Sequence, residues 1–246
     1  MRGHFKRDGD AARREDRRRS GRPAAFFDLD GTLLTVNSGR LWLRRERRNG
    51  RINVGQALKG IMFLGLYRLG SINIERAMSE ALETVRGEPE ERLRRWTREW
   101  YWEEVASFGA PGAAAVLTAH RAAGHPLVLL TSSSPYASEC AVEQFELDDY
   151  LSTVYELDNK RFTGRVVPPI CYGAGKVEKA EAYARDHDID LDGSWFYSDS
   201  ATDLPMLERV ARPRVVHPDP RLRREARRRG WPILDWAAAG GEPMDL

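Results

Sequence analysis

Short apolar runs and helical patterns alternate over much of the chain. Short, mainly apolar runs of strand length occur at 24–29, 127–130, 195–197 and 214–216. Stretches with helical character separate or follow them, at roughly 113–123, 135–145, 175–187, 203–210 and 222–229. Strands that alternate with helices in this way indicate a parallel sheet with helices on both faces. The predicted fold class is therefore α/β.

One long segment breaks this alternation. From Ser38 to about Ser107 the pattern is helical throughout, with Gly50, Gly70 and Gly87 as interruptions. We expect a helical domain over 37–107, inserted into an α/β core formed by 23–36 and 108–246. The most apolar stretch of the insert, 61–66, is too short to span a membrane, so a buried helix is expected there.

Two smaller features complete the predicted structure. Val154–Glu156 and Phe162–Val167 are expected to pair as a short hairpin across residues 158–160. The three tryptophans of the insert are expected to pack in a core or between domains, namely Trp96, Trp100 and Trp102.

Charge is distributed unevenly along the chain. The net charge is +2, yet residues 1–22 contain nine Lys or Arg and only four Asp or Glu. These residues lack apolar periodicity, which predicts a disordered basic tail. Contact between this tail and nucleic acid is an alternative interpretation, but the rest of the chain lacks a basic stripe interleaved with aromatic residues, so no nucleic-acid partner is expected.

The remaining composition favours a cytoplasmic protein. No apolar run follows the basic residues at the N-terminus, so a signal peptide is not indicated. No stretch is long and apolar enough for a spanning helix, and no membrane partner is expected. Cys140 and Cys171 are the only cysteines and lie in no metal-type spacing, so both are expected to be free thiols.

Polar clusters follow three of the predicted strands. Asp28 and Asp30 come at the end of the first, Thr131 and Ser132 after the second, and Asp199 with Asp203 after the third. In parallel α/β sheets the ligand site lies beyond the carboxyl ends of the strands. The clusters are therefore expected to converge on one crevice.

The residue types predict phosphoryl transfer with Mg²⁺ as cofactor. Carboxylates crowded together repel one another, and a hard divalent cation relieves that repulsion. One Asp can then attack phosphorus while a second, Asp30, protonates the leaving alcohol and later activates water. Thr131, with the backbone N–H groups of Ser132 and Ser133 at a helix start, forms a candidate phosphate site, and Lys176 adds a positive charge.

Because these polar clusters and Lys176 follow one another in this order, the sequence resembles the haloacid dehalogenase-like (HAD) phosphohydrolases, subfamily IB, which include phosphoserine phosphatase. Residues 26–33, FFDLDGTL, resemble the first motif of that family, and 127–131 the second. Lys176 resembles the third motif, and 198–203 the fourth. The helical insert is similar to the family's cap, and 215–219 with 230–232 resemble the closing segment. The resemblance extends from Pro23 to Trp236 and implies a Rossmann-like core.

The resemblance also implies roles for the candidate residues. Asp28 would be the nucleophile and a magnesium ligand, and Asp30 the general acid/base that binds the metal through its backbone carbonyl. Thr131 and Lys176 would hold the phosphate. Asp199 would be a metal ligand, and Asp203 would support the metal site.

The resulting functional prediction is a magnesium-dependent phosphatase that acts on a small phosphorylated metabolite. A phosphotransferase that passes the phosphoryl group to an acceptor alcohol is the alternative, since the same Asp28 would serve. Phosphoserine phosphatases usually carry a Glu shortly after the first motif, whereas residues 35–45 contain no acid here. Arg40 and Arg44 could instead meet an anionic substrate tail, or be solvated charges of a helix.

Overall fold

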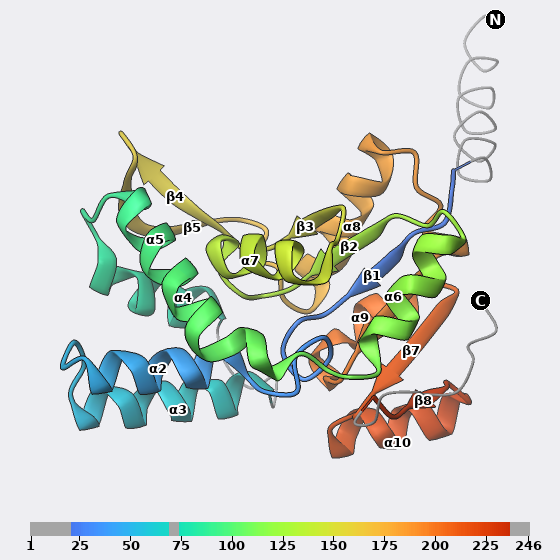
Figure 1. The fold of residues 1–246 in the computed structure, drawn as a ribbon, viewed down its shortest axis with the longest axis horizontal. Coiled ribbons are helices and arrows are strands. Elements are labelled where there is room, and N and C mark those ends of the chain that lie inside the picture. Colours follow the sequence, from blue (N-terminus) through green and yellow to red (C-terminus); the bar gives the residue numbers. More distant parts are fainter. Residues whose placement is uncertain (1–20, 69–73, 237–246) are drawn as a thin grey trace, which may run out of the picture.

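The computed structural model describes residues 21–68 and 74–236 (Figure 1). Residues 1–20 of the predicted tail lie outside this range. Arg22 already belongs to the fold, because its backbone N–H donates to the carbonyl of Asp188 at 3.1 Å. Arg22, which the prediction assigns to the tail, is therefore part of the fold.

Six parallel strands form the central sheet, in the order β3-β2-β1-β6-β7-β8. Phe27 of the central strand lies beside both Leu129 and Tyr197, so the residues that follow these three strands emerge at the same edge. The strands are β1 (Ala25–Phe27), β2 (Leu127–Leu130), β3 (Asp149–Leu151), β6 (Trp195–Ser198), β7 (Arg212–Val216) and β8 (Ile233–Leu234). This confirms the predicted α/β, Rossmann-like fold.

Side chains of the central strand alternate between two cores. Phe27 faces one core, covered by α6 (Ala113–Ala122) and α7 (Pro135–Phe145). Phe26 faces the other, covered by three helices: α8 (Ala174–Asp186), α9 (Leu204–Arg209) and α10 (Pro220–Arg229). Helix α10 is rich in arginine, yet its Leu222 and Ala226 are fully buried.

Two edge strands were not expected from the sequence. Strand β3 has only partly buried residues and begins with an aspartate, and β8 is two residues long. Neither has the uninterrupted apolar run that marks a strand buried on both faces. The run at 214–216, the last strand predicted from the sequence, is therefore followed by one more strand, β8.

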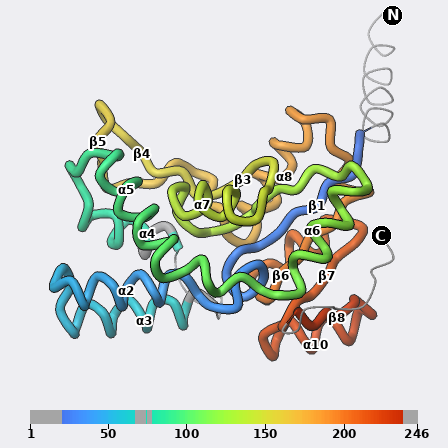
Figure 2. The backbone as a smooth tube through the Cα atoms, viewed as in Figure 1, coloured from blue at the N-terminus to red at the C-terminus, as the bar shows by residue number. Residues whose placement is uncertain are grey.

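The helical insert extends over 38–108, between β1 and α6, and its described residues form four α-helices. They are α2 (Ser38–Arg48), α3 (Val54–Arg68), α4 (Ile74–Leu82) and α5 (Glu90–Trp100), and a π-helical turn over Tyr101–Val105 continues α5. Figures 1 and 2 show α2 and α3 side by side at one end of the molecule, away from the sheet. The turn between them passes through Gly50, whose φ is +70°.

Two packing expectations for the insert are wrong. The helix that contains 61–66 is not buried: Ile61 and Met62 are 46% and 55% exposed, because no described element covers that side of α3. Trp102 is 40% exposed, whereas Trp100 is buried against Trp42 as expected.

The predicted hairpin is confirmed, as β4 (Val154–Asp158) and β5 (Arg161–Val167). The hairpin also forms backbone hydrogen bonds with the insert. The N–H of Gly87 donates to the carbonyl of Phe162 at 2.8 Å, and the N–H of Glu90 to that of Lys160 at 2.9 Å. The hairpin therefore joins the insert to the part of the chain that follows β2.

Candidate active site

The predicted clusters meet at the carboxyl edge of the sheet. Asp28 directly follows β1, and its N–H donates to the carbonyl of Tyr197 in β6 at 2.9 Å. Asp199 follows β6 and lies against the turn after Asp28. Gly31 has a φ of +78°, and a Cβ there would collide with the Asp199 carboxylate. Glycine is thus needed for the two acidic loops to approach so closely.

Lys176 connects two of the carboxylates. Its Nζ donates to Oδ1 of Asp28 and to Oδ2 of Asp203, each at 2.8 Å. Asp203 also accepts from Oγ of Ser198 at 2.7 Å. Lys176 and Asp203 are each 2% exposed and Asp28 is 7% exposed. This is a buried, hydrogen-bonded charge group in which removal of the cation would leave two carboxylates facing each other.

A close backbone approach places Lys176 at this point. The lysine lies in the first turn of α8, which begins after Gly173, a residue with a φ of +54°. A Cβ on Gly175 would collide with the carbonyl oxygen of Ile170. The start of α8 can therefore press against the preceding loop only because glycine stands there.

Burial changes the protonation of the candidate nucleophile. The pKa of Asp28 is raised to about 7, chiefly because burial disfavours the charged form. Lys176 opposes this shift, while the neighbouring Asp203 and Asp30 add to it. A further positive charge beside Asp28 would favour its carboxylate form at neutral pH.

Asp30 is held by a separate set of contacts. Its Oδ1 accepts from the backbone N–H of Ser38 at 2.9 Å, and its Oδ2 accepts from Nδ2 of Asn37 at 3.2 Å. The Oδ1 of Asn37 in turn accepts from the N–H of Arg40 at 3.1 Å, which caps α2. One asparagine therefore fixes both the start of the insert and the second carboxylate.

Thr131 and the serines after it form a polar turn before α7. Oγ1 of Thr131 accepts from the N–H of Ser133 at 3.2 Å, and Oγ of Ser134 accepts from the N–H of Ala137 at 3.1 Å. Thr131 is 2% exposed and Ser132 is half-buried. The oxygens and N–H groups of this turn lie at a helix N-terminus, which suits an anion. Phosphate binding here stays a prediction.

The donor set suits Mg²⁺. Among the residues described, no three His, Cys, Asp or Glu side chains converge as a metal cluster. Magnesium, however, takes only one or two carboxylates and completes its shell with waters, carbonyls and phosphate oxygens. Asp28, Asp199 and the backbone carbonyl of Asp30 fit that requirement. Asp203 is engaged by Lys176 and Ser198, which fits a supporting position.

Two residues of the site were not found from the sequence. Asn37 was missed, although an asparagine just before a helical pattern is a common N-cap signal. Asp219 was missed as a residue that supports the loop after β6. Its Oδ2 accepts from the N–H of Ala201 at 2.7 Å, and its own N–H donates to the carbonyl of Asp199 at 2.9 Å. Nothing in the residues around Asp219 indicates that it supports a loop formed by residues 199–203.

Comparison with known proteins decides the family. Residues 25–208 match the family of haloacid dehalogenase-like hydrolases. The chain belongs to that family. It is 33% identical over 219 residues to the inhibition of morphological differentiation protein of Streptomyces azureus, which covers 87% of this chain and 79% of that protein.

Other relatives of this chain carry phosphatase names. A phosphoserine phosphatase of Mycobacterium tuberculosis is 31% identical over 220 residues, covering 88% of this chain and 71% of that one. A histidinol-phosphatase of Neisseria meningitidis is 25% identical over 217 residues, covering 86% and 98%. The predicted enzyme class, a phosphoric monoester hydrolase, agrees with these relatives.

Solved structures confirm the fold. A protein of unknown function from Bordetella pertussis superimposes with a TM-score of 0.78 at 29% identity, covering 87% of this chain and 98% of that chain. A phospho-aspartyl intermediate analogue of phosphoserine phosphatase superimposes with a TM-score of 0.65 at 16% identity, covering 89% and 95%. The second likeness concerns the fold alone.

Proposed function

We propose that this family member is a magnesium-dependent phosphatase that hydrolyses a small phosphomonoester through an aspartyl-phosphate on Asp28. One observation carries the proposal. Two carboxylates two residues apart are held by different partners, Asp28 by Lys176 and Asp30 by Asn37 and the N–H of Ser38. Such separation allows one to act as nucleophile while the other transfers protons.

In the first half-reaction, an oxygen of Asp28 attacks phosphorus and the ester P–O bond breaks. Asp30 gives its proton to the departing alkoxide, which leaves as an alcohol. Lys176, with the N–H groups before α7, balances charge on the phosphoryl oxygens. Bound Mg²⁺ would neutralise part of the charge on Asp28 and on the phosphoryl group.

In the second half-reaction, Asp30 is a carboxylate and takes a proton from water. The water oxygen attacks phosphorus, the bond between phosphorus and the Asp28 oxygen breaks, and inorganic phosphate is released. Asp30 returns to its protonated form. The contacts from Asn37 and Ser38 hold its carboxylate in one orientation through both halves.

The proposed substrate is a small metabolite phosphate, like the compounds in the names of the phosphoserine and histidinol phosphatases among the relatives. The first turn of α2, which follows the catalytic motif, carries no acidic side chain. A positively charged substrate group would therefore have to be met by another part of the insert.

The test combines product release with detection of the intermediate. Phosphate release is measured on a panel that includes phosphoserine and histidinol phosphate, with and without Mg²⁺. Acid-quenched samples are digested and searched for a phosphoryl group on the peptide that contains Asp28. Magnesium-dependent release with that adduct is expected; release without any adduct in an early quench would contradict the covalent route. Transfer to added glycerol at the expense of free phosphate would indicate a phosphotransferase.

A further inference from the structure

Helix α3 presents large apolar side chains to solvent. Val54, Leu58, Ile61 and Met62 are 54%, 62%, 46% and 55% exposed. Their spacing of three and four residues places them on one side of the helix, here called the α3 face. Among the α3 side chains that the structure describes, only Ala57 is buried. Single exposed apolar residues are common, but a contiguous group of them marks a surface that meets a partner.

Unpaired arginines border this face. Arg40, Arg44 and Arg47 are exposed and follow one another along one side of α2. Within the described part of the chain none of the three forms an ion pair, whereas Arg45 and Arg48 of the same helix both bind Glu104. The arginines of α2 that form no ion pair with another described residue therefore lie on one side of the helix.

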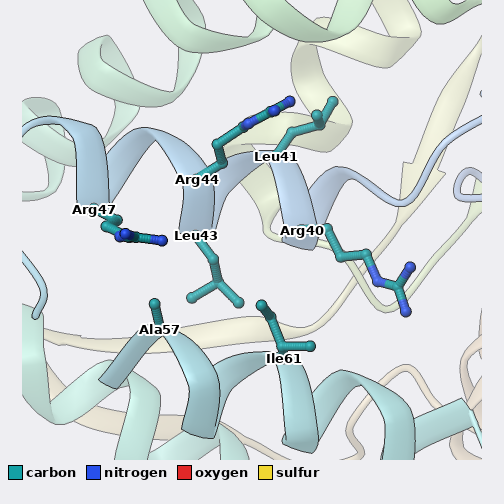
Figure 3. Close-up of a pocket in the computed structure, with 7 residues that line it drawn as sticks. All are labelled: Arg40, Leu41, Leu43, Arg44, Arg47, Ala57 and Ile61. Atoms are coloured by element: carbon teal, nitrogen blue, oxygen red, sulfur yellow. The ribbon is translucent and has the colours of Figure 1, made fainter. Parts of the chain in front are cut away.

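The three arginines share a groove with one residue of the α3 face, Ile61. The groove has a volume of about 470 Å³ and lies between α2 and α3. The arginines line it together with Leu41, Leu43, Ala57 and Ile61 (Figure 3). Ser38, which contacts Asp30, lies two residues before Arg40 and so on nearly the opposite side of α2, since two residues turn a helix by about 200°. This position makes the arginines unsuited to meeting the tail of a substrate bound at Asp30.

The charges around the α3 face distinguish between the partners that could bind there. A second copy of the chain would bring like arginine stripes together, which opposes association. Two acids of the neighbouring helices are already engaged, Glu46 of α2 by Arg51 and Glu80 of α4 by Lys59. A layer of anionic headgroups above an apolar interior matches both features at once, because apolar side chains enter the interface while arginines meet phosphate groups.

We propose that the outer side of the α2–α3 pair docks on the surface of an anionic phospholipid bilayer, with α3 lying in the interface. Docking differs from spanning, and no helix in the described ranges is long and apolar enough to cross a bilayer. The proposal revises the sequence-based expectation that the protein has no membrane partner. It does not depend on the proposed catalytic function.

The experiment is flotation of the full-length protein with two kinds of vesicle. One contains phosphatidylcholine alone, and the other equal parts of phosphatidylcholine and phosphatidylglycerol. The variant is Leu58→Glu/Met62→Glu. The matched control is Val154→Glu/Leu157→Glu, which changes two apolar residues of the hairpin that are 47% and 37% exposed. Circular dichroism and the melting temperature verify that both variants fold.

Wild type and control are expected to bind the anionic vesicles equally, and the α3 variant at least about tenfold more weakly, because two apolar side chains no longer enter the interface. Each Arg→Gln change at positions 40, 44 and 47 should weaken binding by about fivefold. The basic residues of 1–22 are the same in all variants, so charge attraction through them cannot produce these differences.

Equal vesicle binding by wild type and the α3 variant, or binding by neither, would overturn the proposal. Sedimentation without lipid measures the oligomeric state and tests the alternative partner, a second copy of the chain. A wild-type dimer that Leu58→Glu/Met62→Glu dissociates would assign the α3 face to a second copy of the chain instead.

Discussion

The carboxyl edge of the sheet and the α3 face depart from ordinary burial in opposite directions. At the sheet edge, Asp28, Lys176 and Asp203 are charged groups that are almost completely buried. On α3, Leu58 and Met62 are apolar and more than half exposed. Buried charge and exposed apolar surface are both unfavourable for folding alone. The contrast teaches that the two regions suit different partners: the small polar substrate that we propose for the sheet edge, and the large amphiphilic surface that we propose for the α3 face.

The largest expected effect is at the nucleophile. Asp28→Asn should lower kcat by more than about 10⁴-fold, because an amide does not form the acyl phosphate. Steady-state phosphate release measures it. Asp158→Asn, on the exposed hairpin turn, is the control and should retain full activity. Substantial turnover by Asp28→Asn would contradict the proposal that Asp28 is the nucleophile.

Removal of the buried cation tests the same region through stability. Lys176→Met should lower the free energy of unfolding by about 3–5 kcal/mol at pH 8, because Asp28 and Asp203 lose their shared partner. Urea denaturation measures it. The loss should be smaller at pH 5, where Asp28 can be protonated. A loss that is equally small at both pH values would mean that the lysine is not buried between these carboxylates.

The raised pKa of Asp28 predicts that the stability of the protein falls as pH rises. The folded state holds this proton up to about pH 7, against an ordinary value of 3.8, so the folded state binds more protons than the unfolded state between them. The metal-free protein should therefore lose stability as pH rises through this window, and Mg²⁺ should restore it. Melting temperatures measured from pH 4 to 8 should fall more steeply in wild type than in Asp28→Asn. Parallel curves would contradict the shift.

Asn37 tests whether the start of the insert and the acid/base residue are coupled. Asn37→Asp keeps a good N-cap for α2 but places a carboxylate beside Asp30, which disfavours the charged form that accepts a proton from water. Breakdown of the intermediate should slow by about tenfold and move to higher pH.

The matched control is Asn37→Ser, which also caps the helix but adds no charge. Its pH profile should keep the wild-type position, even if its rate falls. Single-turnover measurements separate formation of the intermediate from its breakdown. Equal profiles for the Asp and Ser variants would show that the Asn37 contact has no role in proton transfer.

The smallest effect is expected on the α3 face. Leu58→Glu/Met62→Glu should change the free energy of unfolding by no more than about 0.5 kcal/mol, because both side chains are exposed. Urea denaturation without lipid measures it. A large loss would mean that this face is packed within the protein, and the contrast with the sheet edge would disappear.

The sequence predicts the sheet edge much better than the insert. Strands β1, β2 and β6 are buried on both faces, so each is an apolar run except for Ser198 at the end of β6, and the polar residues that follow the run mark the site. Asp28, Thr131 and Asp199 could be placed in this way. The edge strands β3 and β8 lack such runs, because each has a neighbour on one side only.

The insert was harder to predict for a different physical reason. An apolar stretch such as 61–66 indicates that something covers it, but its pattern does not say whether the cover belongs to the same chain. The role of Asn37 was hidden because it combines a local contact, the N–H of Arg40, with a contact to Asp30 that depends on the turn between them. The periodicity of the sequence shows neither what covers residues 61–66 nor that Asn37 contacts Asp30.

The hairpin that holds the insert has a consequence for synthesis. Arg161 donates from its guanidinium to the carbonyl of Gly87 at 2.7 Å, across 74 residues of chain. At ribosomal rates of about 5–20 residues per second, the partner of Gly87 is made roughly 4–15 seconds after Gly87 itself. Until then, the end of the insert around Gly87 lacks the strand that pairs with it. A nascent chain should therefore protect this end of the insert from proteases only after β5 has left the ribosome.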